Sequence, residues 1–322
     1  MRPRLACVIE QDQAAFAGFP CESTWRLMMQ SGRKSVILKT IYHLEDDSTM
    51  AEAAAPTKTK KIALITGASS GIGAEFALQI EKKYYLDEVW MIARRPIPMK
   101  ELAERFLKSR GVILNFDLTS RTDLTALERR LAEDKPEIDF LVNNAGYGKF
   151  GPVSELGLDE QIKMIELNVT ALTYLTRIAI PYMKPGSSII QVASSAAFSP
   201  SPFFSVYAAS KSFVVSFSDA LGFELRNQGI GVLAVCPGPV ETEFFAVAQK
   251  NEFMKDKVGD VEPGERKLSA SPRDVVAKAL RDLDRGRRHS IYGIPMRIFG
   301  LLAPLVPLGI KLRLLGRRNH GK

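Results

Sequence analysis

The chain has 322 residues, of which 46% are hydrophobic and 25% are charged. This composition is typical of a globular protein and excludes a disordered, collagen-like or disulfide-stapled chain. Forty-four lysines and arginines against 36 aspartates and glutamates leave a formal charge of +8, which suits anionic ligands, lipid headgroups or nucleic acid without choosing among them.

Three cysteines without a CxxC spacing argue against a disulfide framework and against a zinc site. The three histidines are scattered along the chain, so no metal site is predicted. The N-terminus lacks the apolar core of a signal peptide, and no run reaches the ~18 apolar residues of a membrane span. We therefore expect a cytoplasmic protein.

The first 57 residues have no sustained hydrophobic period and run into an Ala/Pro/Thr/Lys-rich stretch at 53–61. We expect residues 1–57 to be an N-terminal extension that is disordered or not native. One hypothesis is that the natural chain starts at Met50, which stands just before that stretch.

From Lys61 onward, short apolar runs alternate with longer amphipathic stretches. This pattern predicts an α/β fold of one domain over residues 58–293, a doubly wound, Rossmann-like parallel sheet with helices on both faces. The predicted strands are 62–66, 88–93, 111–115, 138–142, 188–193, 230–236 and 290–292. The predicted helices are 72–83, 99–109, 121–133, 159–183, 206–227 and 272–283.

A glycine-rich turn follows the first predicted strand and opens the first helix. Its backbone N–H groups and the helix dipole would face one point outside the sheet, which suits a pyrophosphate. The spacing, GxxxGxG, departs from the general GxGxxG fingerprint, and such a turn can also be purely structural. The candidate residues are Gly67, Ser69, Ser70, Gly71, Ile72 and Gly73.

Arg94 and Arg95 stand about 20 residues beyond the glycines, at the end of the second predicted strand. An acidic residue here would bind the ribose 2′-hydroxyl of NAD. Arginine instead offers a permanently charged fork to a phosphate, so this pair favours the 2′-phosphate of NADP(H). The alternative is that one or both arginines are solvated surface residues.

Tyr207 and Lys211 lie four residues apart in a predicted helix, so they project from one face. A neighbouring ammonium favours the phenolate and would lower the pKa of the tyrosine toward the working range of a proton shuttle. By itself this YxxxK spacing is weak evidence, and its context makes it informative.

Several further motifs occur in a fixed order around this pair: Thr66-x-x-x-Gly71-Ile72-Gly73, Asn143-Asn144-Ala145-Gly146, Asn168, Ser194, Tyr207-x-x-x-Lys211 and Pro237-Gly238. In this order and spacing the chain resembles the short-chain dehydrogenase/reductase family over about residues 61–292. Each element alone is common, whereas their joint occurrence is specific.

The resemblance implies roles for four residues. Tyr207 would be the general acid and base, and Ser194 would bind the substrate oxygen. Lys211 would hold the nicotinamide ribose and lower the tyrosine pKa, and Asn168 would anchor a water chain to the lysine. The structural alternative for Asn168 is a helix irregularity stabilised by its amide. Ser195, one residue nearer to Tyr207, is assigned a local backbone role.

The resemblance also implies the rest of the dinucleotide site. One pair would flank the adenine, a second group would lie along the adenosine ribose, and a third would bind the cofactor through Pro237-Gly238 and contact the nicotinamide amide through Val240 and Thr242. These residues are Asp117 and Leu118; Asn144, Ala145 and Gly146; and Pro237, Gly238, Val240 and Thr242. The alternative for the Asn-Asn-Ala-Gly run is a turn that ends a strand and holds the central sheet.

Apolar side chains surround the predicted catalytic residues, and they suit a lipid-like or steroid-like carbonyl compound or alcohol. Ordinary core packing is the alternative. The residues are Phe198, Phe203 and Phe204 before Tyr207, and Phe244, Phe245, Val247, Phe253 and Met254 after Pro237-Gly238.

The C-terminal segment, residues 294–322, is apolar and basic together. One interpretation is an interfacial element on anionic lipid. The other, which we favour at this point, is a cover over the substrate cleft or a subunit contact. The family resemblance implies a homodimer or homotetramer through the long helices.

Together these features predict an NADP(H)-dependent oxidoreductase that interconverts a carbonyl and a secondary alcohol. The competing class is a dinucleotide-binding sensor or scaffold without turnover. The presence of all four implied catalytic residues argues against it. Nucleic-acid binding is not expected, because the basic residues are dispersed and no recognition motif accompanies them.

Overall fold

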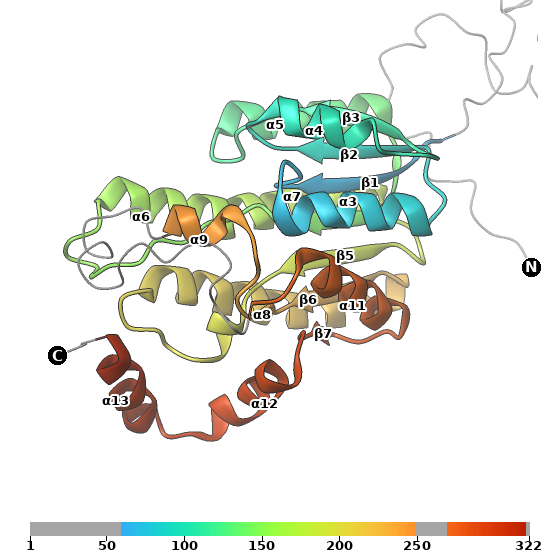
Figure 1. Ribbon diagram of the computed structural model, residues 1–322. Coiled ribbons are helices and arrows are strands. Elements are labelled where there is room, and N and C mark those ends of the chain that lie inside the picture. The colour runs from blue at the N-terminus through green and yellow to red at the C-terminus, as the bar shows by residue number, and fades with distance from the viewer. Residues whose placement is uncertain (1–58, 249–268, 320–322) are drawn as a thin grey trace, which may run out of the picture. The chain divides into compact units, whose positions relative to one another are not determined.

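The computed structural model describes residues 59–248 and 269–319, so the predicted extension 1–57 lies outside the described residues. A parallel sheet of seven strands in the order β3-β2-β1-β4-β5-β6-β7 forms the centre (Figure 1). The strands are β1 Lys61–Thr66, β2 Glu88–Ile92, β3 Arg110–Leu114, β4 Glu137–Asn143, β5 Ser188–Val192, β6 Gly231–Val235 and β7 His289–Ser290. The predicted Rossmann-like fold is thus confirmed, with every strand end within two residues of its expected place.

Helices cover both faces because the strands are apolar on both. In β1, Ala63 and Ile65 face one layer, and Ile62 and Leu64 face the other. The first layer contains α3 Gly71–Lys83, α4 Pro96–Ala103 and α11 Pro272–Asp284. The second contains α5 Arg121–Asp134, α7 Leu172–Ala179 and α8 Ser205–Glu224.

Helix α4 lies earlier than the predicted 99–109. Pro96 occupies its first turn, where the fixed φ of proline favours a helix start. Beyond Ala103 the backbone turns to the buried Glu81, whose carboxylate accepts from the N–H groups of Leu107 and Lys108 at 2.8 and 2.5 Å. A carboxylate from another helix therefore replaces the helical hydrogen bonds there.

The helix predicted as one unit over 159–183 is interrupted. It consists of α6 Leu158–Ile165, a π-helical segment at Glu166–Ala171, then α7 and a 3₁₀ turn at Ile180–Tyr182. Hydrophobic periodicity does not reveal a π segment, because it inserts one residue into an otherwise continuous apolar stripe.

The order of the strands reverses beside β1, since β2 and β4 flank it on opposite sides. Ligands of such sheets bind outside the carboxyl ends of the strands at this switch point. The turns after β1, β2, β3, β4, β5 and β6 meet at that edge, and they carry most of the predicted site.

Candidate active site

The turn between β1 and α3 has the close packing expected of a phosphate cradle. Gly67 and Gly71 adopt φ values of +66° and +57°, which favour glycine. A Cβ on Gly73 would lie 2.3 Å from the Gly67 carbonyl oxygen. Gly73 therefore shapes the turn and does not line the cavity in front of it.

The Asn-Asn-Ala-Gly run ties this turn to β4. Asn144 Nδ2 donates to the carbonyl oxygens of Thr66 and Gly67 at 3.0 and 3.2 Å. Thr66 Oγ1 in turn accepts from the backbone N–H groups of Asn144 and Ala145 at 2.9 and 3.0 Å. The Asn-Asn-Ala-Gly run therefore acts as the turn that ends β4 and holds the central sheet, and Asn144, Ala145 and Gly146 also line the cavity.

A cavity of about 1020 Å³ runs along the carboxyl edge of the sheet. It brings together every predicted site residue except Gly73 and Asn168. The predicted residues that line it are Gly67, Ser69, Ser70, Gly71, Ile72, Arg94, Arg95, Asp117, Leu118, Asn144, Ala145, Gly146, Ser194, Tyr207, Lys211, Pro237, Gly238, Val240 and Thr242.

Tyr207 and Lys211 project from α8 into this cavity, and both are buried. Lys211 Nζ donates to the Val192 carbonyl oxygen at 2.8 Å and lies 5.8 Å from the centre of the Tyr207 ring. Ser194, at the end of β5, forms a hydrogen bond with Tyr207. Its Oγ also accepts from the Ala196 N–H at 3.2 Å.

The pKa of Tyr207 differs from the expected one. Burial raises it to about 12, and the Ser194 hydrogen bond opposes this only in part. Burial also lowers the pKa of Lys211 to about 8. The expected lowering of the Tyr207 pKa by Lys211 is not found for the protein alone, because burial raises this pKa and the Lys211 Nζ is bonded to the Val192 carbonyl oxygen.

Ser195 has the local role expected of it, since its backbone N–H donates to the Pro237 carbonyl oxygen at 2.8 Å. This bond joins the ends of β5 and β6.

Asn168 lies in the π-helical segment, fully buried behind the cavity. Its side chain bonds the backbone of Tyr147 in both directions, at 3.1 and 2.9 Å, and the Ser210 hydroxyl at 3.0 Å. The helix irregularity weighed for Asn168 is present, whereas the water chain stays a prediction.

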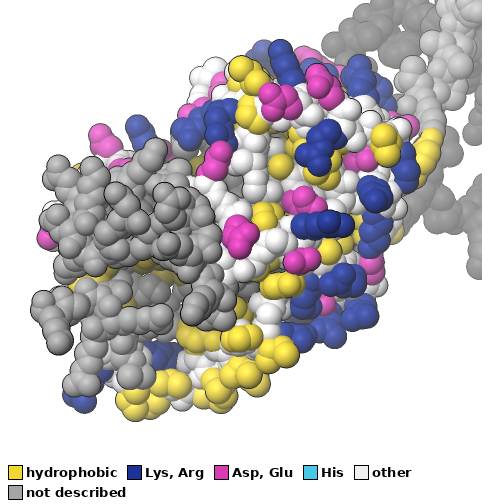
Figure 2. Space-filling model, in the orientation of Figure 1, with side chains coloured by type: hydrophobic (Ala, Val, Ile, Leu, Met, Phe, Trp, Pro, Cys, Tyr) yellow, Lys and Arg dark blue, Asp and Glu magenta, His cyan; other side chains and the backbone are white. Residues whose placement is uncertain are grey.

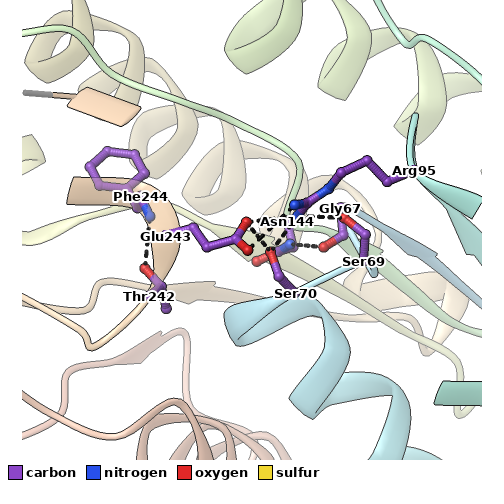
Figure 3. A network of polar contacts seen from close by, with 8 residues as sticks. All are labelled: Gly67, Ser69, Ser70, Arg95, Asn144, Thr242, Glu243 and Phe244. Carbon is purple, nitrogen blue, oxygen red and sulfur yellow. Dashed lines mark hydrogen bonds and ion pairs between the residues drawn. The ribbon is translucent and has the colours of Figure 1, made fainter. Parts of the chain in front are cut away.

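The two arginines have different partners, and Figure 3 shows those of Arg95. Arg95 reaches the cradle, with Nη2 at 3.3 Å from Ser69 Oγ and 3.2 Å from Ser70 Oγ. Arg94 lies 4.0 Å from the Asp117 carboxylate, and its side chain is 75% exposed. Arg95 is therefore the arginine whose charge faces the glycine-rich turn.

Glu243 is a site residue that the sequence analysis missed. It begins α9 Glu243–Ala248, and its carboxylate lies 2.7 Å from Arg95 Nη2 and 3.3 Å from Ser70 Oγ (Figure 3). The hydrogen bond from Arg95 lowers the pKa of Glu243. Glu243 could have been considered for the site because it follows Thr242, a predicted cofactor-binding residue. However, no sequence spacing links it to Arg95, which is 148 residues away.

Aromatic side chains form one wall beside Tyr207. Phe204 stacks on the Tyr207 ring with 4.3 Å between centroids and on Phe150 with 3.8 Å, and Phe244 lies 5.3 Å from Tyr207. Phe198 packs elsewhere, against the core cluster that contains Ala193, Val214 and Cys236. Phe253 and Met254 lie outside the described residues, as do the side chains of Phe245 and Val247.

Comparison with known proteins agrees with this architecture. The short chain dehydrogenase family model matches residues 61–252. An NADP-dependent 3-hydroxy acid dehydrogenase of Schizosaccharomyces pombe is 32% identical over 232 residues, which cover 70% of this chain and 87% of that protein.

Two solved structures illustrate the similarity and the range of cofactors. A short-chain dehydrogenase from Sphingobium yanoikuyae in complex with NADPH has a TM-score of 0.62 at 28% identity, covering 80% of this chain and 94% of its own. A 3-ketoacyl-(acyl-carrier-protein) reductase from Brucella melitensis complexed with NADH has a TM-score of 0.59 at 26% identity, covering 72% and 96%. The fold, the cavity and the match over most of the domain establish that the chain belongs to the short-chain dehydrogenase/reductase family of oxidoreductases.

Proposed function

We propose that this protein is an NADP(H)-dependent oxidoreductase that interconverts a carbonyl and a secondary alcohol on a hydrophobic substrate. The observation that carries the proposal is that one cavity holds both a phosphate-binding turn with Arg95 and the Ser194–Tyr207–Lys211 group. A dinucleotide long enough to reach from the first to the second would place its nicotinamide beside Tyr207.

The protein's own residues supply the proton and the orientation. With its pKa raised, the Tyr207 phenol is protonated at neutral pH, so it donates its proton to the oxygen of a carbonyl compound during reduction. Ser194, bonded to Tyr207, holds the same oxygen and stabilises the negative charge that develops on it. Lys211 would hold the ribose, and the bound dinucleotide supplies hydride chemistry.

The choice of NADP(H) rests on the way Arg95 already pairs with an anionic group of the protein, the Glu243 carboxylate. Glu243 places a carboxylate between Arg95 and Ser70, beside the N-terminus of α3. A group that pairs with a carboxylate there is suited to a phosphate as well. Since relatives bind either NADPH or NADH, this local charge supports the assignment better than the family does.

The cofactor choice predicts a selective loss. Replacing Arg94 and Arg95 together by glutamine removes the guanidinium groups and leaves the glycine-rich turn intact. A charge-assisted hydrogen bond contributes about 1.5–3 kcal/mol, so we expect NADPH to bind roughly 10- to 150-fold more weakly and NADH to be little affected. Dissociation constants measured by fluorescence titration for both cofactors test this expectation.

The matched control replaces two exposed arginines outside the cavity, Arg105 and Arg129, by glutamine. This variant should bind both cofactors as the parent does. Equal losses for NADPH and NADH in the Arg94/Arg95 variant would mean that these arginines support the fold, and an unchanged ratio would remove the basis of the NADP assignment.

A second expectation concerns Glu243, which would compete with the 2′-phosphate for Arg95. In Glu243→Gln the competing charge is gone, so NADPH should bind more tightly while NADH does not. Exposed ion pairs are weak, and both side chains are more than half exposed, so the gain should be roughly two- to five-fold. Glu241→Gln, which removes an exposed charge two residues away, is the control. Weaker NADPH binding by Glu243→Gln would show instead that Glu243 helps to hold the cofactor.

The apolar wall of Phe204, Phe150 and Phe244 supports a hydrophobic substrate, because it lies against the ring whose hydroxyl would meet the reacting oxygen. A panel of ketones and alcohols of increasing apolar bulk, followed by the change in NADPH absorbance, tests the function as a whole. We expect turnover to be most efficient with bulky apolar members. Preference for small polar ketones would contradict the substrate class.

A further inference from the structure

Two short helices end the described chain, α12 Ile294–Leu302 and α13 Leu308–Asn319. They follow the last strand, β7, and run along the lower side of the view in Figure 1. Helix α12 is apolar on both sides. Toward the protein it presents Met296 and Gly300, and Gly300 lies close to Ile291 and Phe198; Ala303, the first residue after the helix, is buried.

The opposite side of α12 faces solvent. Ile294, Ile298 and Leu301 recur at spacings of four and three residues and so share one helix face, and Leu305 lies in the 3₁₀ turn that follows at Ala303–Leu305. Three of them are among the most exposed large apolar side chains described, with Ile294 at 72%, Leu301 at 73% and Leu305 at 74%. Figure 2 shows hydrophobic side chains gathered along this lower edge. The apolar face of a helix normally packs against another element, and on the solvent side of α12 this face is left open.

Large apolar side chains are also exposed at the end of α12 and in α13. Leu302, Leu308, Ile310 and Leu312 are 40–56% exposed. We call the whole set, Ile294, Ile298, Leu301, Leu302, Leu305, Leu308, Ile310 and Leu312, the C-terminal apolar surface. Large apolar side chains exposed in such number on neighbouring elements are typical of a binding site for a protein or a membrane.

Charge distinguishes the possible occupants. Residues 294–322 contain six basic residues, Arg297, Lys311, Arg313, Arg317, Arg318 and Lys322, and no aspartate or glutamate. This segment therefore holds six of the eight net positive charges of the chain. Cations interleaved with large apolar residues are typical of an element that lies in the headgroup region of an anionic bilayer.

A second copy of the chain fits this surface less well. A two-fold contact would bring the same surface of both copies together and oppose cation to cation without an acid to neutralise them. Exposed apolar residues suited to self-association occur on other helices, such as Ile162 and Ile165 of α6 and Phe223 of α8.

We propose that α12 and α13 dock the protein onto anionic lipid bilayers through the C-terminal apolar surface and its interleaved cations. No helix in the described part of the chain is long and apolar enough to cross a bilayer, so the segment would lie in the interface. Met296 of α12 packs over Gly238, which lines the cavity. A docked α12 would thus hold one side of the cavity near the lipid, where an apolar substrate concentrates.

The experiment is co-sedimentation of the full-length protein with phosphatidylcholine vesicles, with and without phosphatidylglycerol, at low and high salt. This experiment measures membrane binding and not turnover, so its result does not depend on whether the proposed enzymatic function is correct. We expect binding that requires phosphatidylglycerol and weakens as salt is added. Absence of binding to the phosphatidylglycerol vesicles at low salt would overturn the proposal.

Two sets of variants identify the surface. Replacing Arg297, Lys311 and Arg313 by glutamine should weaken partitioning roughly 100-fold, at about five-fold for each cation. The matched control replaces Lys82, Arg105 and Arg129, which are exposed on other elements, and should bind as the parent does. Equal losses in both variants would mean that total charge alone causes binding, which contradicts a dedicated surface.

The apolar half is tested with Leu301→Ser and Leu305→Ser together, against Ile97→Ser and Leu107→Ser, which are equally exposed elsewhere. The first pair should reduce binding to phosphatidylglycerol vesicles and leave the oligomeric state in lipid-free solution unchanged. If it instead converts an oligomer to a smaller species, the surface is a contact between copies of the chain and the proposal is wrong. Circular dichroism and NADPH titration verify that each variant is folded.

Discussion

Tyr207→Phe should lower turnover by a factor on the order of 10²–10⁴ while leaving NADPH affinity nearly unchanged. The substitution removes the only proton that the ring can transfer. It keeps the ring itself, which stacks on Phe204 and packs in the aromatic wall, so the shape of the cavity is retained. Turnover is measured on a substrate that the parent protein accepts, and NADPH affinity by fluorescence titration.

Tyr174→Phe is the matched control, because its hydroxyl is bonded to Glu128 on the surface and away from the cavity. It should leave turnover unaltered. Near-normal turnover by Tyr207→Phe would remove Tyr207 from the chemistry, and a comparable loss of NADPH affinity would show that the substitution disturbs the dinucleotide site.

Ser194→Ala should cost roughly 100-fold or more in turnover, since a donor to a developing oxyanion is lost. The effect should fall on kcat more than on KM if Ser194 acts chiefly in the transition state. Both hydroxyls at the end of β5 border the cavity. However, Ser194 bonds Tyr207, whereas Ser195 uses its backbone N–H to hold the end of β6.

Ser195→Ala is therefore the neighbouring control, because it keeps that backbone bond and should lose far less turnover than Ser194→Ala. A reversed order, with Ser195→Ala as the crippling change, would mean that the thirteen-residue spacing to Tyr207 selects the wrong serine.

Sequence patterns were sufficient to predict the parallel sheet and to predict which residues gather around the cavity. The strands are continuous apolar runs, and their carboxyl ends meet at one edge whatever the exact boundaries are. Residues placed just after strands, such as Gly67, Ser194 and Pro237, therefore converge even when each strand end shifts by a residue.

Features that depend on contacts between distant segments could not be predicted. The early end of α4 depends on the carboxylate of Glu81 in α3, and the Arg95 partner Glu243 lies in α9. The tyrosine pKa was misjudged for a similar reason. Helical spacing puts Lys211 near Tyr207, but only the packed structure shows that burial dominates and that the ammonium is bonded to Val192.

The most direct test of the central claim, that this cavity catalyses carbonyl reduction with NADPH, uses NADPH deuterated at both C4 positions. The protein is incubated with this cofactor and a bulky apolar ketone from the panel, and the alcohol product is analysed by mass spectrometry. We expect an alcohol that carries one deuterium on its carbinol carbon, formed by the parent protein and lost in Tyr207→Phe. NADPH binding without deuterated alcohol from any ketone in the panel would contradict it and would identify the chain as a dinucleotide-binding protein without turnover.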